Sequence, residues 1–147
     1  MADAKDLIGT IHEIRDTCLC LAAQRAARVL ARRFDALFAP LGITNGQFSM
    51  MCALMGTWGP KLSELAAFLA MDQTTVTAAV RTLERKGLLV LVADAADGRV
   101  RRPRLTDAGR AVVVRAIPLW RAEHAAVQAE VRGADARELA RVLSQLG

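Results

Sequence analysis

The order of elements in the middle of the chain is the feature that most limits how it can fold. Residues 62–70, "LSELAAFLA", carry apolar residues at helical spacing, and Ser63 is the expected N-cap of this short helix. Only Met71 then precedes Asp72, the expected N-cap of a second helix that extends to about residue 89. Two helices separated by so short a turn predict a helix-turn-helix.

After this second helix the spacing of apolar residues changes from helical to strand-like. Residues 90–93, "VLVA", predict a short strand, residues 94–99, "DAADGR", a turn, and residues 100–105, "VRRPRL", a returning strand. Pro103 has no amide hydrogen and therefore belongs on an edge strand, which fits a two-stranded ribbon. A helix-turn-helix followed by such a ribbon predicts a winged helix-turn-helix.

Helices are expected on both sides of this centre, so the predicted fold is mainly α with the hairpin as a small wing. A composition that is 53% apolar but only 4% aromatic favours helices over strands. The expected flanking helices are residues 13–39, 45–58, 106–131 (capped by Thr106 and kinked at Pro118) and 133–146 (capped by Asp135). The expected organisation is one compact domain with three regions, residues 1–42, 43–106 and 107–147.

The chain is basic, with 20 Lys and Arg against 15 Asp and Glu, a net charge of +5 and an isoelectric point near 9.9. Arginine, which can bond phosphates and base edges through two parallel hydrogen bonds, accounts for 17 of the 20 basic residues. This balance favours a polyanionic partner.

Several other classes of protein are not expected. His12 and His124 are isolated, no nucleophile motif or glycine-rich phosphate loop is present, and neither an enzyme, a metal site nor a cofactor is predicted. The N-terminus does not resemble a signal peptide, and no apolar run reaches the roughly 18 residues that cross a bilayer. With three cysteines that cannot all pair within the chain, we expect a protein of the reducing cytoplasm, without a membrane partner.

The helix that begins after Asp72 has two contrasting faces. At about 100° per residue, its buried stripe is expected to comprise Val76, Val80, Leu83 and Gly87. The opposite face has short side chains near its N-terminus and arginines farther along, which suits insertion into a DNA major groove. On this face Gln73 can read adenine and Arg81 can read guanine, although an ordinary solvated face would look the same on the helix alone.

The expected hairpin favours the DNA interpretation. Residues 99–104 hold four arginines, and arginines on a ribbon can enter a minor groove or contact phosphates. Because side chains alternate along a strand, we expect Arg99 and Arg101 to face DNA, and Arg102 and Arg104 to face solvent or acidic groups of the protein. The side chains expected at double-stranded DNA are Ser63, Gln73, Thr74, Thr75, Thr77, Ala78, Arg81, Arg85, Arg99 and Arg101.

The two segments "LSELAAFLAMDQTTVTAAVRTLERKGLL" and "DAADGRVRRPRLTDAGR" resemble the MarR family of bacterial transcription regulators. The wing signature D-x-R followed by L-T-x-x-G-R is present from Asp97 to Arg110. The resemblance covers nearly the whole chain and implies a repressor that binds a near-palindromic operator as a homodimer, joined by the helices of the N- and C-terminal regions. The chain departs from the family at Ala70, where glycine is common, and at Pro103 in the returning strand.

Relatives of this kind commonly bind a small aromatic acid where the dimer helices meet the DNA-binding region. The resemblance implies such an effector here, with an arginine to hold a carboxylate and methionines that adapt to irregular apolar shapes. The same apolar residues could equally be core, and the arginine an exposed helix charge. The candidate ligand-binding residues are Gln24, Arg28, Phe34, Phe48, Met51, Met55 and Trp120.

Two alternatives to this effector-released repressor remain open. Cys20 matches the position of the reactive cysteine in the organic-hydroperoxide-sensing branch of the family, which would make the protein a redox sensor. That branch uses tyrosines to hold the thiolate, whereas this chain has none and carries Gln24 and Phe34 in their places, so Cys20 is expected to be a packed small hydrophobe. The other alternative is a winged-helix module for protein contacts only, which would not need arginines in its wing.

Overall fold

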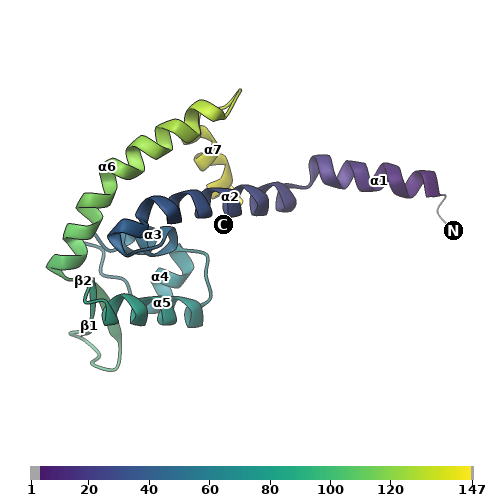
Figure 1. Ribbon diagram of the computed structural model, residues 1–147. Coiled ribbons are helices and arrows are strands. Elements are labelled where there is room, and N and C mark those ends of the chain that lie inside the picture. Colours follow the sequence, from purple (N-terminus) through teal and green to yellow (C-terminus); the bar gives the residue numbers. More distant parts are fainter. Residues whose placement is uncertain (1–3, 147) are drawn as a thin grey trace.

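The computed structural model describes residues 4–146, which form helices and one two-stranded hairpin (Figure 1). In chain order the elements are α1 (Ala4–Thr17), α2 (Leu19–Phe38), the 3-10 turn Ala39–Leu41, α3 (Asn45–Ala53), α4 (Leu62–Phe68), α5 (Gln73–Arg85), β1 (Leu89–Ala93), β2 (Arg101–Leu105), α6 (Asp107–Glu130), α7 (Ala136–Leu143) and the 3-10 turn Ser144–Leu146. This order confirms the predicted mainly α fold with a hairpin wing.

The N-terminal part of the chain forms two helices, α1 and α2, where one helix over residues 13–39 was expected. Cys18 is extended (φ −70°, ψ 105°) and ends α1, and its Sγ accepts a hydrogen bond from the Leu21 amide as the N-cap of α2. The break costs little, because the Cys18 amide still donates to Ile14 and its carbonyl still accepts from Ala22. Beyond this point α1 extends away from the rest of the molecule (Figure 1).

α4 and α5 form the expected helix-turn-helix. Asp72 is the N-cap of α5 as predicted, accepting from the Thr75 amide at 2.8 Å. Ser63 was wrongly predicted to cap α4, because the N-cap is Lys61, whose amide donates to the Glu64 carboxylate at 2.7 Å. Between the helices Ala70 adopts φ +51°, a left-handed conformation that glycine adopts with less strain.

The wing is the predicted antiparallel hairpin, with Leu89 opposite Leu105 and Leu91 opposite Pro103. It joins α6 by a very close approach of backbones. A Cβ atom on Gly109 would lie 2.1 Å from the Leu88 carbonyl oxygen, so this position accepts only glycine in the present packing. The glycine of the L-T-x-x-G-R signature is therefore explained by contact between the first turn of α6 and the hairpin.

The remaining helices follow the sequence with one change of detail. Thr106 and Asp135 cap α6 and α7 as predicted, and Pro118 lies within α6 without interrupting it. α3, in contrast, ends at Ala53 and not near residue 58.

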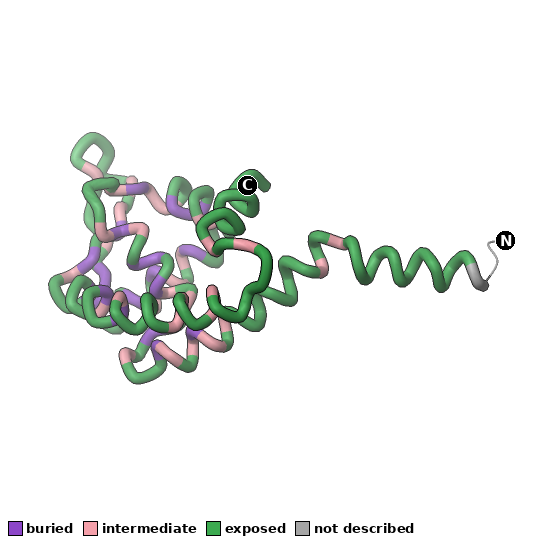
Figure 2. The backbone as a smooth tube through the Cα atoms, turned by 90° about the horizontal axis from the view of Figure 1, so that it is seen from above, coloured by how far each residue is buried: buried purple, intermediate pink, exposed green. Residues whose placement is uncertain are grey.

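The core lies where the end of α2, the helices α3 to α5, the hairpin and the first half of α6 meet (Figure 2). Within the described residues, neither α1 nor α7 contains a buried side chain. We call residues 43–106 the head, and α1 together with residues 136–146 the terminal arms. The buried residues are Phe34, Phe38, Ile43, Phe48, Met50, Met51, Leu54, Leu65, Ala66, Val76, Val80, Leu83, Leu88, Leu89, Leu105, Val113 and Ala116.

Candidate nucleic-acid interface

The outer face of α5 is exposed along its length, as the sequence predicts. Val76, Val80 and Leu83 are buried on the inner side, whereas the expected fourth member, Gly87, lies beyond the end of the helix and is exposed. Its φ of +71° explains the difference, because Gly87 ends the helix in a left-handed conformation. A shallow depression of about 440 Å³ on the outer face is lined by Gln73, Thr74, Thr77, Ala78 and Arg81.

The threonines of this face have different roles. The Thr75 hydroxyl and amide both donate to Asp72, and these bonds hold the pKa of that carboxyl below its usual range. The Thr77 hydroxyl donates to the Gln73 carbonyl at 2.7 Å, whereas the Thr74 hydroxyl has no hydrogen-bond partner among the described residues. Thr75 therefore supports the beginning of α5, and Thr74 is the hydroxyl available to an outside partner.

Arg85 lies one turn beyond the depression and Ser63 lies on α4. The Arg85 guanidinium donates to the Thr82 hydroxyl at 3.1 Å, and the Ser63 side chain is exposed in the first turn of α4. Farther along, the Lys86 ammonium donates to the Gly42 carbonyl at 2.8 Å and thereby fastens the end of α5 to the loop before α3.

The wing presents Arg99 and Arg101 to solvent. Arg99 is in the turn, not in a strand, so the alternation assumed for it does not apply; the Asp97 carboxylate accepts from its amide at 3.0 Å. Arg101 begins β2, opposite Ala93. Arg102 turns to acidic groups of the protein, as predicted, and Arg104 is exposed.

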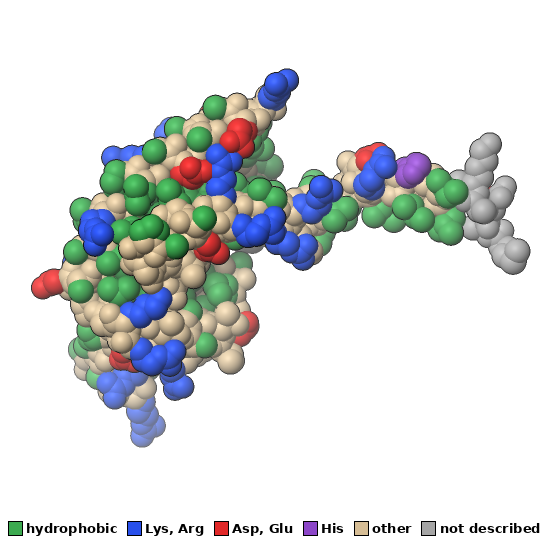
Figure 3. Space-filling view, in the orientation of Figure 1, with side chains coloured by type: hydrophobic (Ala, Val, Ile, Leu, Met, Phe, Trp, Pro, Cys, Tyr) green, Lys and Arg blue, Asp and Glu red, His purple; other side chains and the backbone are tan. Residues whose placement is uncertain are grey.

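Basic side chains gather over α5 and the wing at the lower edge of the molecule (Figure 3). Such a surface attracts a polyanion, and it joins the short-chained face of α5 to two exposed wing arginines.

A second depression, about 630 Å³ in volume, lies where α3, α4 and α6 meet. Of the seven residues proposed as a ligand site, only Phe48 and Trp120 line it. Its lining consists of Phe48, Ser49, Cys52, Ala53, Phe68, Ile117, Trp120 and Arg121. The residues of α3 and α6 that the sequence did not single out recur every three or four positions, but this spacing does not show that the two faces meet each other and Phe68 of α4.

The other five proposed ligand residues lie elsewhere. Phe34 and Met51 are buried in the core, and Met55 is half-buried against it. Gln24 and Arg28 are exposed on α2, where the Arg28 guanidinium donates to the Gln24 side chain at 3.3 Å. The arginine beside the depression is thus Arg121 on α6 and not Arg28.

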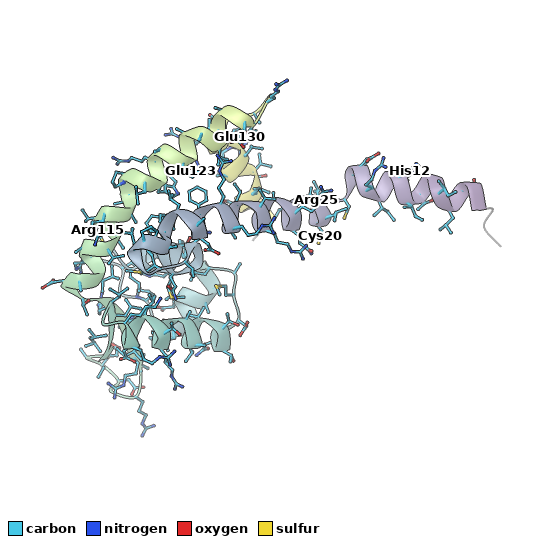
Figure 4. The ribbon with its side chains drawn as sticks, viewed as in Figure 1. His12, Cys20, Arg25, Arg115, Glu123 and Glu130 are labelled. Carbon is cyan, nitrogen blue, oxygen red and sulfur yellow. The ribbon has the colours of Figure 1, made fainter. Side chains whose placement is uncertain are left out.

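Cys20 differs from the packed thiol that was expected. Cys20 is exposed near the beginning of α2 (Figure 4), and its Sγ accepts a hydrogen bond from the Gln24 amide group at 3.1 Å. The expectation of a packed small hydrophobe is therefore wrong for the single chain. Cys52 lies in the second depression, where desolvation by its neighbours raises the pKa of its thiol.

Charged and aromatic pairs connect the longer helices. Arg33 on α2 forms ion pairs with Glu123 and Glu130 of α6, the latter at 2.8 Å, and both carboxylates lie on the side of α6 that faces α2 (Figure 4). Hydrogen bonds to Glu130 and Glu123 raise the pKa of the Arg33 guanidinium. Trp120, which is 36% exposed, stacks on His124 with ring centroids 4.7 Å apart.

Trp58 is 42% exposed in the single chain and packs edge-on against Phe68, with ring centroids 5.3 Å apart. The described part of the chain brings together no group of three or more His, Cys, Asp or Glu side chains that could hold a metal ion. Among residues 4–146, no helix combines the length and apolar character needed to cross a membrane.

Comparison with known proteins agrees with this geometry. Residues 43–101 match the model of the MarR family. The HTH-type transcriptional repressor Rv2887 of Mycobacterium tuberculosis is 32% identical over 123 residues, which cover 84% of this chain and 88% of the relative.

Two solved structures are also similar. The M. tuberculosis regulator MosR in complex with DNA superposes with a TM-score of 0.78 at 37% identity, over 88% of this chain and 92% of that one. BpsR of Bordetella bronchiseptica, studied for regulation of its DNA binding by 6-hydroxynicotinic acid, has a TM-score of 0.71 at 25% identity, over 88% and 91% of the two chains. These relatives are transcriptional regulators and not enzymes, and they do not favour a module for protein contacts alone.

Proposed function

The chain belongs to the MarR family of DNA-binding transcriptional regulators, and we propose that it is a homodimeric repressor that releases its operator when a small aromatic acid binds. The observation that carries the DNA-binding part is the exposed outer face of α5 next to an arginine-bearing wing. The cytoplasm, where the chromosome lies, is the proposed place of action.

In this proposal α5 enters the major groove of the operator. Gln73, Thr74 and Arg81 reach base edges, while the small Ala78 and the hydroxyl of Thr77 let the helix approach closely. Arg85 and Ser63 contact phosphates on either side, and Arg99 and Arg101 of the wing contact the flanking minor groove or its phosphates. Thr75 acts through Asp72, because its hydroxyl is already bonded there.

A homodimer is supported by apolar side chains that the terminal arms leave uncovered. Leu7, Ile11 and Ile14 of α1 are each more than half exposed, and they recur at helical spacing on one face. Leu143 and Leu146 at the other end of the chain are 56% and 72% exposed. Apolar surface of this kind is covered in an assembly, and a second copy would also supply the second head that a near-palindromic operator requires.

The effector is proposed to bind in the depression between α3, α4 and α6. Phe48, Phe68 and Trp120 offer aromatic walls, and Arg121 at the rim can hold a carboxylate by two hydrogen bonds. The volume of about 630 Å³ suits a small organic molecule. The similarity to BpsR, whose DNA binding is regulated by 6-hydroxynicotinic acid, supports an aromatic acid.

Because this depression joins α6 to the head, a bound acid would favour one spacing of the two heads. Release follows only if the acid binds the DNA-free spacing more tightly than the DNA-bound one. The test is a thermal-shift screen of aromatic acids followed by measurement of DNA release. A compound that raises the melting temperature and weakens DNA binding supports the proposal, and Arg121→Gln should abolish both effects. If no aromatic acid does both, the effector part of the proposal is wrong.

A thiol-based sensor is a second candidate, because Cys20 is exposed and accepts a hydrogen bond from Gln24. Cys20→Ser discriminates between the two. An effector-released repressor keeps its DNA binding and acid response in this variant, whereas a redox sensor loses peroxide-induced release.

A further inference from the structure

Arg102 and Arg104 occupy one face of β2 above the loop that joins α3 to α4. They are two residues apart in the strand, so both side chains project to the same side. Gly59 of this loop lies directly beneath them, and a Cβ atom there would be 2.2 Å from the Arg104 guanidinium. The loop therefore passes so close to the wing that a side chain at position 59 would collide with the Arg104 guanidinium, and glycine avoids this collision.

Arg102 joins three separate segments of the head. Its Nε lies 3.3 Å from Asp94 Oδ1 and its Nη2 lies 3.4 Å from Asp94 Oδ2, so both nitrogens face one carboxylate at the beginning of the wing loop. Its Nη1 donates to the Gly59 carbonyl and lies 3.8 Å from the Glu64 carboxylate at the beginning of α4. Arg104, in contrast, forms no ion pair and no side-chain hydrogen bond with the described residues.

These contacts are more protected than ordinary surface ion pairs. The side chains of Arg102 and Asp94 are 25% and 15% exposed. The hydrogen bonds from Arg102 keep the pKa of the Asp94 carboxyl below its usual range. A pair that is both partly buried and hydrogen-bonded is held in a defined geometry, unlike exposed pairs that form and break in solvent.

The two acidic partners of Arg102 each begin or close an element used for DNA binding. The Asp94 amide donates to the Val100 carbonyl at 2.9 Å and closes the loop that carries Arg99. Glu64 accepts from the Lys61 amide and so begins α4, the first helix of the helix-turn-helix. An isolated two-stranded hairpin is at best marginally stable, so this connection adds to the buried contacts of Leu89, Pro103 and Leu105 that hold the wing.

We propose that Arg102 is a positioning residue for DNA binding, which fastens the wing, where its loop begins, to the beginning of α4 and so holds Arg99 and Arg101 at a set position relative to α5. The inference rests on the proposed function, in which those two arginines contact DNA. A wing that is already in position loses less conformational entropy when it binds, so Arg102 increases affinity without touching DNA.

The test uses Arg102→Gln, with Arg104→Gln as the matched control that removes the same charge from the same face of β2. A DNA duplex selected by the parent protein from a randomised pool serves as probe, in filter-binding titrations at several salt concentrations. We expect Arg102→Gln to weaken binding by about tenfold and Arg104→Gln by less than about threefold, since only Arg102 holds the wing in position. Equal losses in the two variants would show a general charge effect and overturn the proposal.

A double-mutant comparison then separates positioning from direct contact. If Arg102 acts through the wing arginines, adding Arg102→Gln to the Arg99→Ala/Arg101→Ala protein should weaken binding by no more than about twofold. A full additional tenfold loss would mean that Arg102 contacts phosphate itself. Arg102→Lys keeps the charge but not the planar fork, and we expect it to resemble Arg102→Gln.

The outcomes also separate this inference from the proposed function. If Arg99→Ala/Arg101→Ala binds like the parent protein, the wing contacts of the proposed function are wrong. If that protein is weakened but Arg102→Gln is not, only the positioning role fails. Circular dichroism checks that each variant is folded; Asp94→Asn, which removes the charge of the partner, gives an independent measurement and should lose affinity as Arg102→Gln does.

Discussion

The head and the terminal arms use similar apolar side chains in opposite ways. In the head Met51, Leu65 and Leu83 are fully buried, whereas in the arms Leu7 and Leu143 are each 56% exposed. The apolar side chains of the head are thus buried within a single chain, whereas the arms have apolar faces that this chain does not cover. We therefore expect changes in the head to act on folding or on DNA contact, and changes in the arms to act on assembly.

The largest effect is expected from Gly109→Ala, which tests the close packing of α6 against the head. The new Cβ would lie 2.1 Å from the Leu88 carbonyl oxygen, and that carbonyl is held in place by the Thr106 amide at 3.2 Å. The free energy of unfolding should fall by about 3 kcal/mol or more, measured by urea denaturation at fixed protein concentration.

Gly46→Ala is the matched control, because Gly46 lies in α3 and nothing is within 4 Å of the position that an alanine methyl would take. An alanine in a helix should stabilise the head by about 0.5–1 kcal/mol relative to glycine. If both variants unfold like the parent protein, the head is packed more loosely than described.

Ile11→Asp tests the arms. Ile11 is 53% exposed in the single chain, so a charge there should leave the head folded. The same charge should oppose burial of residue 11 in a dimer interface. We expect a loss of about 2–3 kcal/mol of dimerisation free energy, measured by sedimentation equilibrium, together with weaker DNA binding.

His12→Asp adds the same charge at the next position, away from the apolar stripe of α1, and should remain a dimer. Dissociation in both variants, or in neither, would contradict the assignment of this stripe to the interface.

A smaller effect, restricted to DNA binding, is expected on the outer surface of the head. Arg81→Ala should cost about 1–3 kcal/mol of discrimination between bases, because Arg81 lines the outer face of α5. Arg99→Ala should weaken binding to all sequences and reduce its salt dependence, because the wing arginine contacts the backbone or the minor groove. Competition binding with operator and unrelated duplexes measures base discrimination and overall affinity. If both variants behave like the parent protein, the helix and the wing are wrongly assigned.

The smallest effect is expected at the turn of the helix-turn-helix. Ala70→Gly should stabilise the head by about 0.5–1 kcal/mol, since glycine relieves the left-handed strain at φ +51° but gains entropy in the unfolded chain. The midpoint of urea unfolding should rise slightly. A fall in the midpoint would show that the entropy term outweighs the relief of strain.

The sequence predicted the elements of the head well because their signals are local. Asp72 and Thr106 cap helices as expected, and the short strand-like segments 90–93 and 100–105 on either side of a turn with glycine identified the hairpin. The break at Cys18 left no such signal, because apolar spacing continues across it and both backbone groups of Cys18 remain hydrogen-bonded.

The candidate sites were predicted unevenly for a related reason. The outer face of α5 follows from periodicity within one helix, and its five residues lie together. The depression beside Trp120 depends on which helices meet, so the sequence did not single out Phe68 and Arg121, which line it, whereas Arg28 lies outside it. Periodicity identifies the faces of a helix, but it does not identify the helix that each face meets.

The most direct test is to count the chains bound to one selected duplex. Sedimentation velocity over a range of salt concentrations measures this number and the affinity. The account predicts two chains per duplex, with log K falling linearly as log salt rises, because two heads contact phosphates through α5 and the wing. One chain per duplex, or an affinity that does not change with salt, would contradict it.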